Sequence, residues 1–293
     1  DYELIARVGV ASIQYFNGHL DEAGQTFRTA IEGFRLLQNR HALSRNYFNL
    51  ANVSMLLGKF DLALDSVNRS IEVRREIGDQ AGLATALLYA ISIHASMGDW
   101  DQAIFATESA AEVIAHLEIP KLKQECSIRE KLNQLSLGKT VSLSEISELD
   151  PGVDAHAETR GLWFTLLCRA HQVAGQSLDD QTVDEIEEML KGLTGVHLSP
   201  PRCLLAASVA GVIQDCDRAI RILEVILDME EIPPGAPLDM VLSARALLEP
   251  VDSSEREEWE ARAMEAVEER AKLIERPADR RRFLKARLRR LEE

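Results

Sequence analysis

The sequence has 293 residues, of which 46% are apolar, and this apolar content excludes an intrinsically disordered chain. Aromatic residues make up only 5%, and 16 glycines and 9 prolines are too few for a collagen-like chain or a β-sandwich. The 33 basic and 48 acidic side chains give a net charge of −15, so no nucleic-acid partner is expected.

The first part of the chain repeats at a spacing of 40 residues. Gly18, Gly58 and Gly98 are each followed by one variable residue, a large apolar residue, an aspartate and, two positions later, an alanine. The stretch before each glycine carries apolar residues at helical spacing, and glycine accepts the left-handed conformation that ends a helix. The pattern therefore predicts three helix–turn–helix units with a glycine in each turn.

The residues after each turn predict how the second helix begins and packs. Asp21, Asp61 and Asp101 stand where an N-cap belongs, so we expect their carboxylates to accept hydrogen bonds from free backbone N–H groups. Ala63 and Ala103 follow two residues later and are small enough for two helices to approach closely. We expect both alanines to be buried between the helices of their units.

These units resemble the tetratricopeptide repeat (TPR) family. The family pattern of a small residue, a turn glycine, an aromatic or leucine and two small residues seven apart is met by Ala51, Gly58, Phe60, Ala63 and Ser70. The third unit departs from it at Ile91 and Thr107, and the period is 40 rather than the usual 34 residues. The long period resembles arrays of kinesin light chain-like and bacterial signalling proteins. The resemblance covers residues 1–119 and implies an all-α, right-handed superhelix of antiparallel helix pairs, an α-solenoid.

Beyond Pro120 the repeat pattern weakens, and all nine prolines lie after residue 119. Residues 139–150 leave room for only a short helix. Helical spacing of apolar residues continues over residues 121–137, 155–174, 184–193, 202–214, 217–229, 238–248, 254–275 and 280–291. We expect three regions: three regular TPR-like repeats in 1–119, degenerate TPR-like repeats in 120–250, and a long helix with a basic capping helix in 251–293.

The last region reverses the charge of the chain. Residues 270–293 hold ten basic and four acidic side chains. Ser254 and Glu257 predict a capping box at the start of the long helix. An apolar stripe follows at helical spacing: Phe283, Leu284, Leu288 and Leu291. We expect this stripe to cover the end of the stack, with the arginines on the outer face. A targeting arm for an acidic protein, nucleic acid or membrane surface is the alternative.

The sequence offers no motif for catalysis or metal binding. Gly138-Lys139-Thr140 ends like a phosphate-binding loop, but the position that needs a glycine five residues earlier holds Asn133, and a helical segment precedes it. The seven histidines and four cysteines show neither H-E-x-x-H nor C-x-x-C spacing. Paired carboxylates fall on polar helix faces, where water solvates them. We therefore expect no enzyme, no cofactor and no metal.

Cysteine usage and apolar runs bear on the cellular compartment. Four scattered cysteines form no disulfide framework, so we expect buried, reduced thiols at Cys126, Cys168, Cys203 and Cys216. The longest apolar run, residues 204–213, is far shorter than the roughly 20 residues of a membrane span. The chain starts at Asp1 without a charged leader and apolar segment, so we expect a piece of a longer cytoplasmic protein with no membrane partner.

A polar strip is the strongest candidate for a binding site. Arg45, Asn49 and Asn52 are spaced i, i+4 and i+7 on the first helix of the second unit. By the family resemblance, this helix lines the concave groove in which extended peptides are held. Asparagine amides donate and accept, so they can clamp a peptide backbone, and Arg45 can pair with a carboxylate. The other candidates for this groove are Phe48 and Met55 beside the strip, and Tyr15, Leu88 and Ser92 in the neighbouring units.

These observations predict a non-catalytic protein–protein interaction scaffold that binds a peptide or helical segment in its concave groove. The resemblance implies a regulatory part of a larger bacterial signalling protein, with another protein or another domain of the same chain as the partner. Two alternatives stay open. The strip is an ordinary solvated inner face, or the chain is a peptide-ligand sensor that switches an attached effector domain by changing the superhelix pitch.

Overall fold

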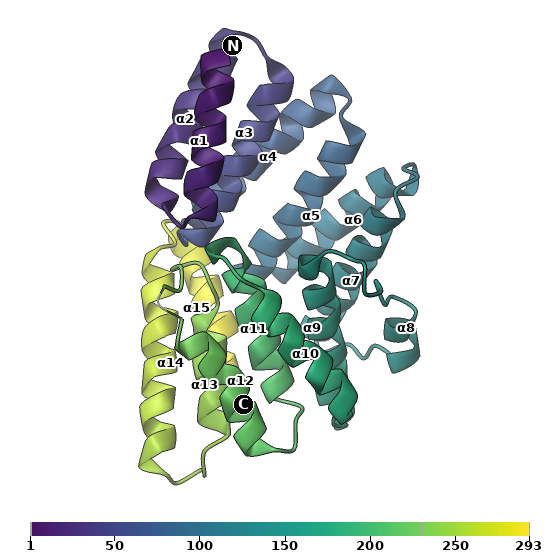
Figure 1. The fold of residues 1–293 in the computed structure, drawn as a ribbon, viewed down its shortest axis with the longest axis vertical. Coiled ribbons are helices and arrows are strands. Elements are labelled where there is room, and N and C mark those ends of the chain that lie inside the picture. The colour runs from purple at the N-terminus through teal and green to yellow at the C-terminus, as the bar shows by residue number, and fades with distance from the viewer. Residues whose placement is uncertain (1, 230, 293) are drawn as a thin grey trace.

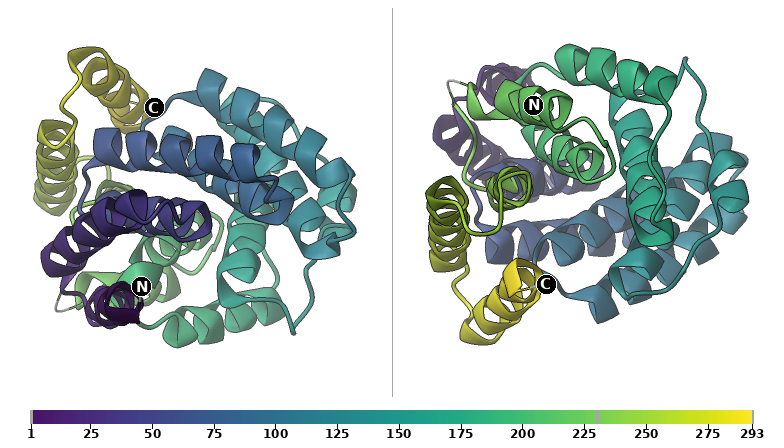
Figure 2. Two further views of the ribbon diagram at one scale, coloured as in Figure 1. Left: turned by 90° about the horizontal axis from the view of Figure 1, so that it is seen from above. Right: turned by 90° about the horizontal axis from the view of Figure 1, so that it is seen from below.

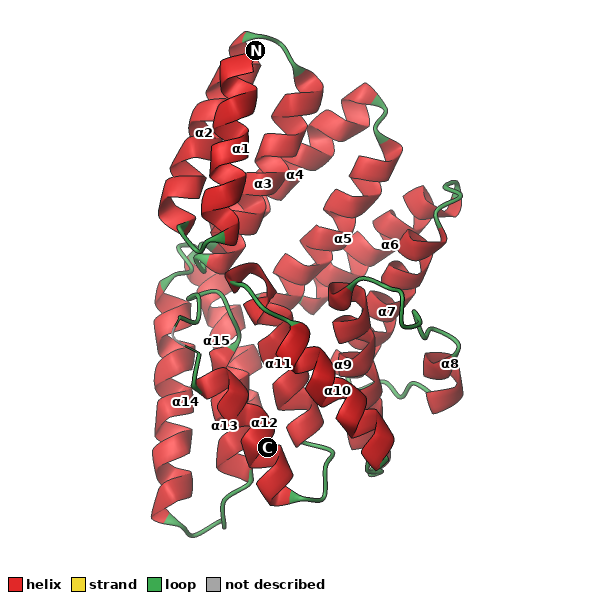
Figure 3. Cartoon of the chain, in the orientation of Figure 1, coloured by secondary structure: helices red, strands yellow, loops and turns green. Residues whose placement is uncertain are grey.

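The computed structural model describes residues 2–229 and 231–292, with side chains up to residue 288, and these residues contain helices and loops but no strand (Figure 1, Figure 3). The first helices are α1 (Tyr2–Phe16), α2 (Leu20–Leu36), α3 (Arg40–Leu56), α4 (Phe60–Ile77), α5 (Gln80–Ser96) and α6 (Trp100–Ala115). The later ones are α7 (Pro120–Ser136), α8 (Leu143–Ser147), α9 (Ala157–Ala174), α10 (Asp180–Gly192), the 3-10 turn η1 (Val196–Leu198), α11 (Ser199–Ala210), α12 (Cys216–Leu227), α13 (Leu238–Leu247), α14 (Ser254–Lys272) and α15 (Pro277–Glu292). The expected all-α fold class is confirmed.

The first six helices form three antiparallel pairs in chain order, with a glycine in the turn of each pair (Figure 1). Gly18, Gly58 and Gly98 have φ values of 85°, 70° and 71°. A side chain is strained in this left-handed region, so the glycine recurs every 40 residues for a conformational reason. Ala63 and Ala103 are fully buried, as predicted. The array is therefore a TPR-like superhelix.

The prediction that aspartates cap the second helices is wrong. The second helices begin at Leu20, Phe60 and Trp100, so that Asp21, Asp61 and Asp101 lie within the first turn. The chain turns so sharply at the glycine that the very next residue takes the N-cap position, and these residues are His19, Lys59 and Asp99. Of the three, only Asp99 caps with its side chain, which accepts from the Gln102 N–H at 3.4 Å.

The C-terminal half lies beneath the first three pairs, and the helices curve around one axis (Figure 1, Figure 2). One buried cluster joins the two parts, because apolar side chains of α3 to α7 share it with Val267, Ala271, Ile274 and Phe283. The first three pairs and the C-terminal helices are thus packed as one body. Among the described residues, no helix is long and apolar enough to cross a membrane.

The three equivalent turns of the helix pairs lie side by side, and segments of the C-terminal half pack against them. We call Gly18, Gly58 and Gly98 the turn ledge. A Cβ at Gly58 would lie 2.5 Å from a methyl carbon of Leu273, and one at Gly98 would lie 2.5 Å from the Cβ of Ala286. At Gly18 the nearest atom belongs to Val196, at 3.1 Å. The ledge glycines therefore serve the turn and the close approach of later segments together.

Asp61 holds the junction between α14 and α15 instead of capping α4. Its Oδ2 accepts from the backbone N–H groups of Glu275 at 2.6 Å and Arg276 at 3.2 Å. The Arg276 guanidinium also donates to Asp65 at 3.0 Å. One turn along the ledge, Arg282 pairs with Asp99. Aspartates from the regular repeats thus anchor the basic C-terminal segment.

The basic helix α15 packs on the body, as expected, but not with all its arginines outward. Phe283 is fully buried, and Leu284 and Leu288 pack against the same cluster, whereas the side chain of Leu291 lies outside the described residues. Arg287 is only 9% exposed and pairs with Asp239 at 3.5 Å. A buried carboxylate needs cationic partners, and this one draws the arginine inward.

Two local predictions in the C-terminal half are also corrected. The helix α14 begins at Ser254, as the predicted range does, but the capping box at Ser254 and Glu257 does not form. The N-cap is the preceding residue, Ser253, whose side chain accepts from the Arg256 N–H at 3.1 Å. Cys216 is exposed at the start of α12, whereas the other three cysteines are buried as predicted.

Candidate functional site

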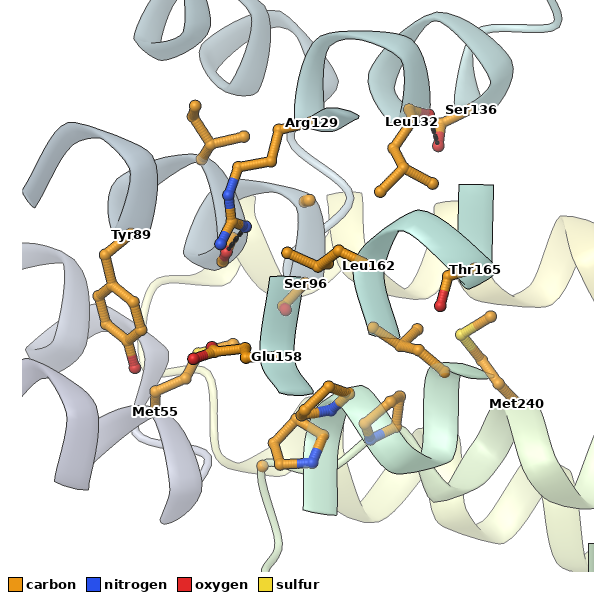
Figure 4. A pocket seen from close by; sticks show the side chains of 18 of the residues that line it. Met55, Tyr89, Ser96, Arg129, Leu132, Ser136, Glu158, Leu162, Thr165 and Met240 are labelled. Atoms are coloured by element: carbon orange, nitrogen blue, oxygen red, sulfur yellow. Dashed lines mark hydrogen bonds between the residues drawn. The ribbon is translucent and has the colours of Figure 1, made fainter. Parts of the chain in front are cut away.

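A cavity of about 250 Å³ lies on the concave side of the helix pairs, and we call it the central cavity. One wall comes from the C-terminal turns of α1, α3 and α5 and from α7. The opposite side comes from α9, η1, α11, α13 and α15. The cavity is therefore enclosed between the regular repeats and the C-terminal half (Figure 4).

One face of α9 follows the length of the cavity. Glu158, Leu162, Thr165 and Arg169 are spaced by four, three and four residues, and all four line the cavity. This spacing places them in one stripe, because α-helical neighbours on a face are three or four residues apart. Figure 4 shows Glu158 near Met55 and Tyr89 at one end and Thr165 near Met240 at the other.

Four of the eight predicted site residues line the central cavity: Tyr15, Asn52, Met55 and Ser92. The Asn52 amide nitrogen donates to the Phe48 carbonyl of its own helix at 2.9 Å, which uses one of its two N–H donors. The second N–H and the amide oxygen are left for a ligand. The Ser92 hydroxyl accepts from the Arg129 guanidinium. These four residues therefore belong to the first wall of the cavity, and their role in peptide binding stays a prediction.

The other four predicted residues do not line the cavity. Arg45 is exposed, Asn49 is half-buried, and Leu88 is 2% exposed and belongs to the hydrophobic core. Phe48 packs edge-on against Tyr89, with ring centroids 5.3 Å apart. The reason is the position of the C-terminal half, which encloses only the ends of the first helices near the turn ledge. Arg45 and Asn49 lie further from the ledge along α3.

Sequence reasoning missed the charged residues that the C-terminal half contributes to the lining: Arg129, Glu158, Arg169 and Arg287. A signal was present at residues 158, 162, 165 and 169, which recur at helical spacing. It was not decisive, because polar residues at such spacing also occur on solvated helix faces. The structure alone distinguishes the two cases.

The Glu158 end of the cavity holds two tyrosines and a histidine in uncharged form. Burial, with the nearby charge of Glu158, raises the pKa of Tyr15 and holds the pKa of Tyr89 well above its ordinary value. Burial lowers the pKa of His197, which the charge of Glu158 only partly opposes. The His197 ring packs on Tyr15 and Phe16, at centroid distances of 5.9 and 5.0 Å. This end offers neutral hydrogen-bonding groups beside one carboxylate.

The buried thiols are poor nucleophiles in this fold. Burial raises the pKa of Cys126 to about 11 and that of Cys203 to about 12, and it raises the pKa of Cys168 further. These thiols stay protonated near neutral pH, and the thiolate is the reactive form. In the part of the chain that the structure describes, no three His, Cys, Asp or Glu residues are grouped so that they could hold a metal ion.

One family model of known proteins matches this chain, and the match falls on the regular repeats. The family model described as Anaphase-promoting complex subunit 5 matches residues 34–94 and, again, residues 82–116. The two overlapping matches lie within the glycine-turn pairs α1 to α6 and cover less than half of the chain. No curated protein matches the sequence.

Two solved structures of TPR-type proteins are similar to the chain at low identity. The crystal structure of yeast Tom70 matches with 12% identity and a TM-score of 0.34, covering 93% of this chain and 58% of the Tom70 chain. The TPR domain of P58(IPK) matches with 14% identity and a TM-score of 0.22, covering 99% of this chain and 98% of that one. Scores this low carry no argument about function, and the chain spans little more than half of Tom70.

Proposed function

We propose that this TPR-like protein is a non-catalytic interaction module that holds a short segment of a protein partner on its concave side. The observation that carries this proposal is the central cavity, which brings Tyr15, Asn52, Met55 and Ser92 together from three successive repeats. Their neutral polar groups suit a peptide backbone, and Met55 adds an adaptable apolar surface. The partner is another protein or another domain of the same polypeptide.

The finer part of the proposal is a regulatory role within a larger bacterial signalling protein. The 40-residue period supports it through the resemblance to kinesin light chain-like and bacterial signalling arrays. Four free cysteines also fit the reducing conditions of the cytoplasm, where we place the protein.

A binding experiment with matched variants tests the proposal. Phage-displayed random peptides of 12 residues are selected on the protein, and an enriched peptide is synthesised as the probe. We expect Tyr15→Ala with Asn52→Ala to weaken this peptide at least tenfold, about 1.4 kcal/mol, without loss of helicity. The control is Arg45→Ala with Asn49→Ala, outside the cavity. Equal affinity of the first double variant and the parent, measured by calorimetry, would move the interface away from the cavity.

A second candidate function is a peptide-ligand sensor, and the enclosure of the cavity favours it. Residues from both halves line the cavity, so an occupant would change how the C-terminal half packs on the turn ledge. If the chain is a sensor, we expect the hydrogen-exchange rates of the α15 amides to change when the selected peptide is added. Unchanged hydrogen exchange in α15 at saturating peptide would contradict the sensor function and would not affect the scaffold function.

A further inference from the structure

Three arginines line the central cavity, Arg129, Arg169 and Arg287, and among the described residues they differ in their carboxylate partners. Arg129 pairs with Glu125 at 2.8 Å, and Arg287 pairs with Asp239 at 3.5 Å. Arg169 donates from Nη1 to the Ser136 hydroxyl at 3.1 Å, and no carboxylate among the described residues pairs with it. We propose that the Arg169 end of the central cavity binds a carboxylate carried on a small apolar body.

The charge of Arg169 is unfavourable as the structure stands. Burial and the neighbouring charge of Arg287 lower the pKa of Arg169, and both effects oppose its positive charge. Arg169 is half-buried, and a cation that is withdrawn from water is costly unless an anion and hydrogen bonds compensate it. An anion in the cavity offsets both the burial and the repulsion, because it pairs with Arg169 and weakens the repulsion from Arg287.

The guanidinium is held in place for an incoming acceptor. Ser136 donates its own proton to the Leu132 carbonyl at 2.9 Å, so its oxygen is fixed as the acceptor for Arg169. This bond uses one of the five N–H donors of an arginine. The remaining donors suit a carboxylate, which accepts two parallel bonds from a guanidinium.

The rest of the cavity indicates an apolar body of limited size. Leu132, Leu162 and Met240, which Figure 4 labels, contribute apolar lining, and so does Leu204. The volume of about 250 Å³ is below the range of roughly 300–1,000 Å³ found for drug-sized ligands, so the ligand is smaller than those.

The ligand has one carboxylate rather than two. Glu158 lies three turns from Arg169 on the same face of α9, about 16 Å away along the helix axis, and its charge repels a second carboxylate at that end. This ligand is held at the Arg169 end of the cavity, whereas the proposed function rests on Tyr15, Asn52, Met55 and Ser92, so different variants test the two proposals.

The test uses octanoate as the probe and octanol as the uncharged control, with binding to the whole chain measured by calorimetry. We expect octanoate to bind and Arg169→Met to weaken it at least tenfold, because the charged hydrogen bonds are lost. Ser136→Ala should weaken it less, since it removes only the group that positions Arg169. The matched control is Arg160→Met, which removes an equal charge from α9 where Arg160 stacks on Phe164 outside the cavity.

Thermal unfolding supplies a second readout. Arg169→Met should melt no lower than the parent, because it replaces a half-buried charge that no described carboxylate pairs with. Octanoate should raise the melting temperature of the parent but not of this variant. A second pair of probes distinguishes a free acid from a peptide C-terminus as the ligand. Binding of the tripeptide Leu-Ala-Leu is compared with binding of the same tripeptide with an amidated C-terminus. Binding of octanoate indicates a free acid, and binding of the tripeptide acid alone indicates a peptide C-terminus.

The inference fails if neither acid binds, if octanol binds as well as octanoate, or if Arg169→Met binds octanoate like the parent. Should Arg169→Met not fold, Ser136→Ala decides: unchanged octanoate affinity in that variant overturns the inference. The proposed function is judged separately, because the phage-selected peptide is tested against the Tyr15 and Asn52 variants. Failure of one proposal in its test therefore does not contradict the other proposal.

Discussion

The first three helix pairs and the C-terminal half are held together by different kinds of contact. In the regular pairs, small residues recur every 40 positions at the helix crossings, and Ala23, Ala63 and Ala103 are all fully buried. In the C-terminal half, the carboxylate of Asp239 is 2% exposed and pairs with Arg270 and Arg287 from two other helices. The first part repeats the same small-residue crossing in each pair. The second part has its own apolar core, from Phe164 to Val241, and adds single long-range ion pairs that join α13 to α14 and α15.

This difference explains why only one half could be repeated in sequence. A repeat works when each unit meets an equivalent neighbour. The C-terminal half meets the turn ledge on one side and the concave face on the other, and no two of its helices have equivalent surroundings. The regular pairs therefore provide a scaffold, and the irregular half provides the charges that enclose the cavity.

We expect the largest effect from a substitution that breaks the charged contact between α13, α14 and α15. Asp239→Ala leaves Arg270 and Arg287 buried without their carboxylate, which should cost about 3–5 kcal/mol of the free energy of unfolding. Urea denaturation measures it. Replacing all three residues by apolar ones of similar size should recover much of the loss. A cost below 1 kcal/mol for Asp239→Ala would show that the pairs are not what holds α13 to α15.

The next prediction uses two equivalent positions of the repeat. Ile13 and Ile93 are separated by two periods, yet Ile13 is 62% exposed on α1 whereas Ile93 is fully buried in the core on α5. Ile93→Ala should cost about 2–5 kcal/mol, and Ile13→Ala should change stability by less than about 0.5 kcal/mol. Thermal and urea unfolding compare the two. Equal costs would mean that the outer face of α1 is also covered in solution.

A third prediction separates the turn conformation from the packing on the ledge. Gly58 and Gly138 both adopt left-handed conformations, with φ of 70° and 75°, but a Cβ would meet Leu273 only at Gly58. Gly138→Ala should cost about 1–2 kcal/mol for the backbone alone. Gly58→Ala should cost about 1–3 kcal/mol more, because it also overpacks the ledge. Identical melting temperatures for the two variants would show that the C-terminal half does not press on this turn.

The smallest expected effect is the response of the charged cluster to acid. Burial tends to raise the pKa of Asp239, but the charges of Arg270 and Arg287 outweigh it and hold the pKa below its ordinary value. The carboxylate therefore adds stability above the pKa of the unfolded chain, about 4, and this contribution is lost as pH falls through the lower folded pKa.

Below about pH 4, unfolding free energies should fall more steeply for the parent than for Asp239→Asn, because the variant has no such proton to take up. Asp154→Asn, at an exposed loop position, serves as the control and should follow the parent. Parallel curves for the parent and Asp239→Asn would mean that this carboxylate titrates alike in the folded and unfolded chains.

The local features of the helix pairs could be predicted from the sequence by itself. Gly58, Phe60 and Ala63 specify a turn, a large apolar residue after it and a close helix crossing, and each depends on neighbours a few residues away. The same reasoning placed the N-caps two residues too far along, because a carboxylate in the first turn and one at the N-cap look alike in sequence.

Only the tertiary structure decided the site. The Asp61 carboxylate and the Glu275 N–H that it binds are 214 residues apart, and no spacing in the sequence encodes such a contact. That return of the chain beneath the turn ledge places Arg169 opposite Ser136 and covers Asn52 while leaving Asn49 outside the cavity. The sequence by itself determined the helices and their repeat, because these arise from local hydrogen bonds and neighbouring side chains. The cavity, and the position of Arg169 in it without a carboxylate partner among the described residues, arise because distant segments pack together in the folded chain.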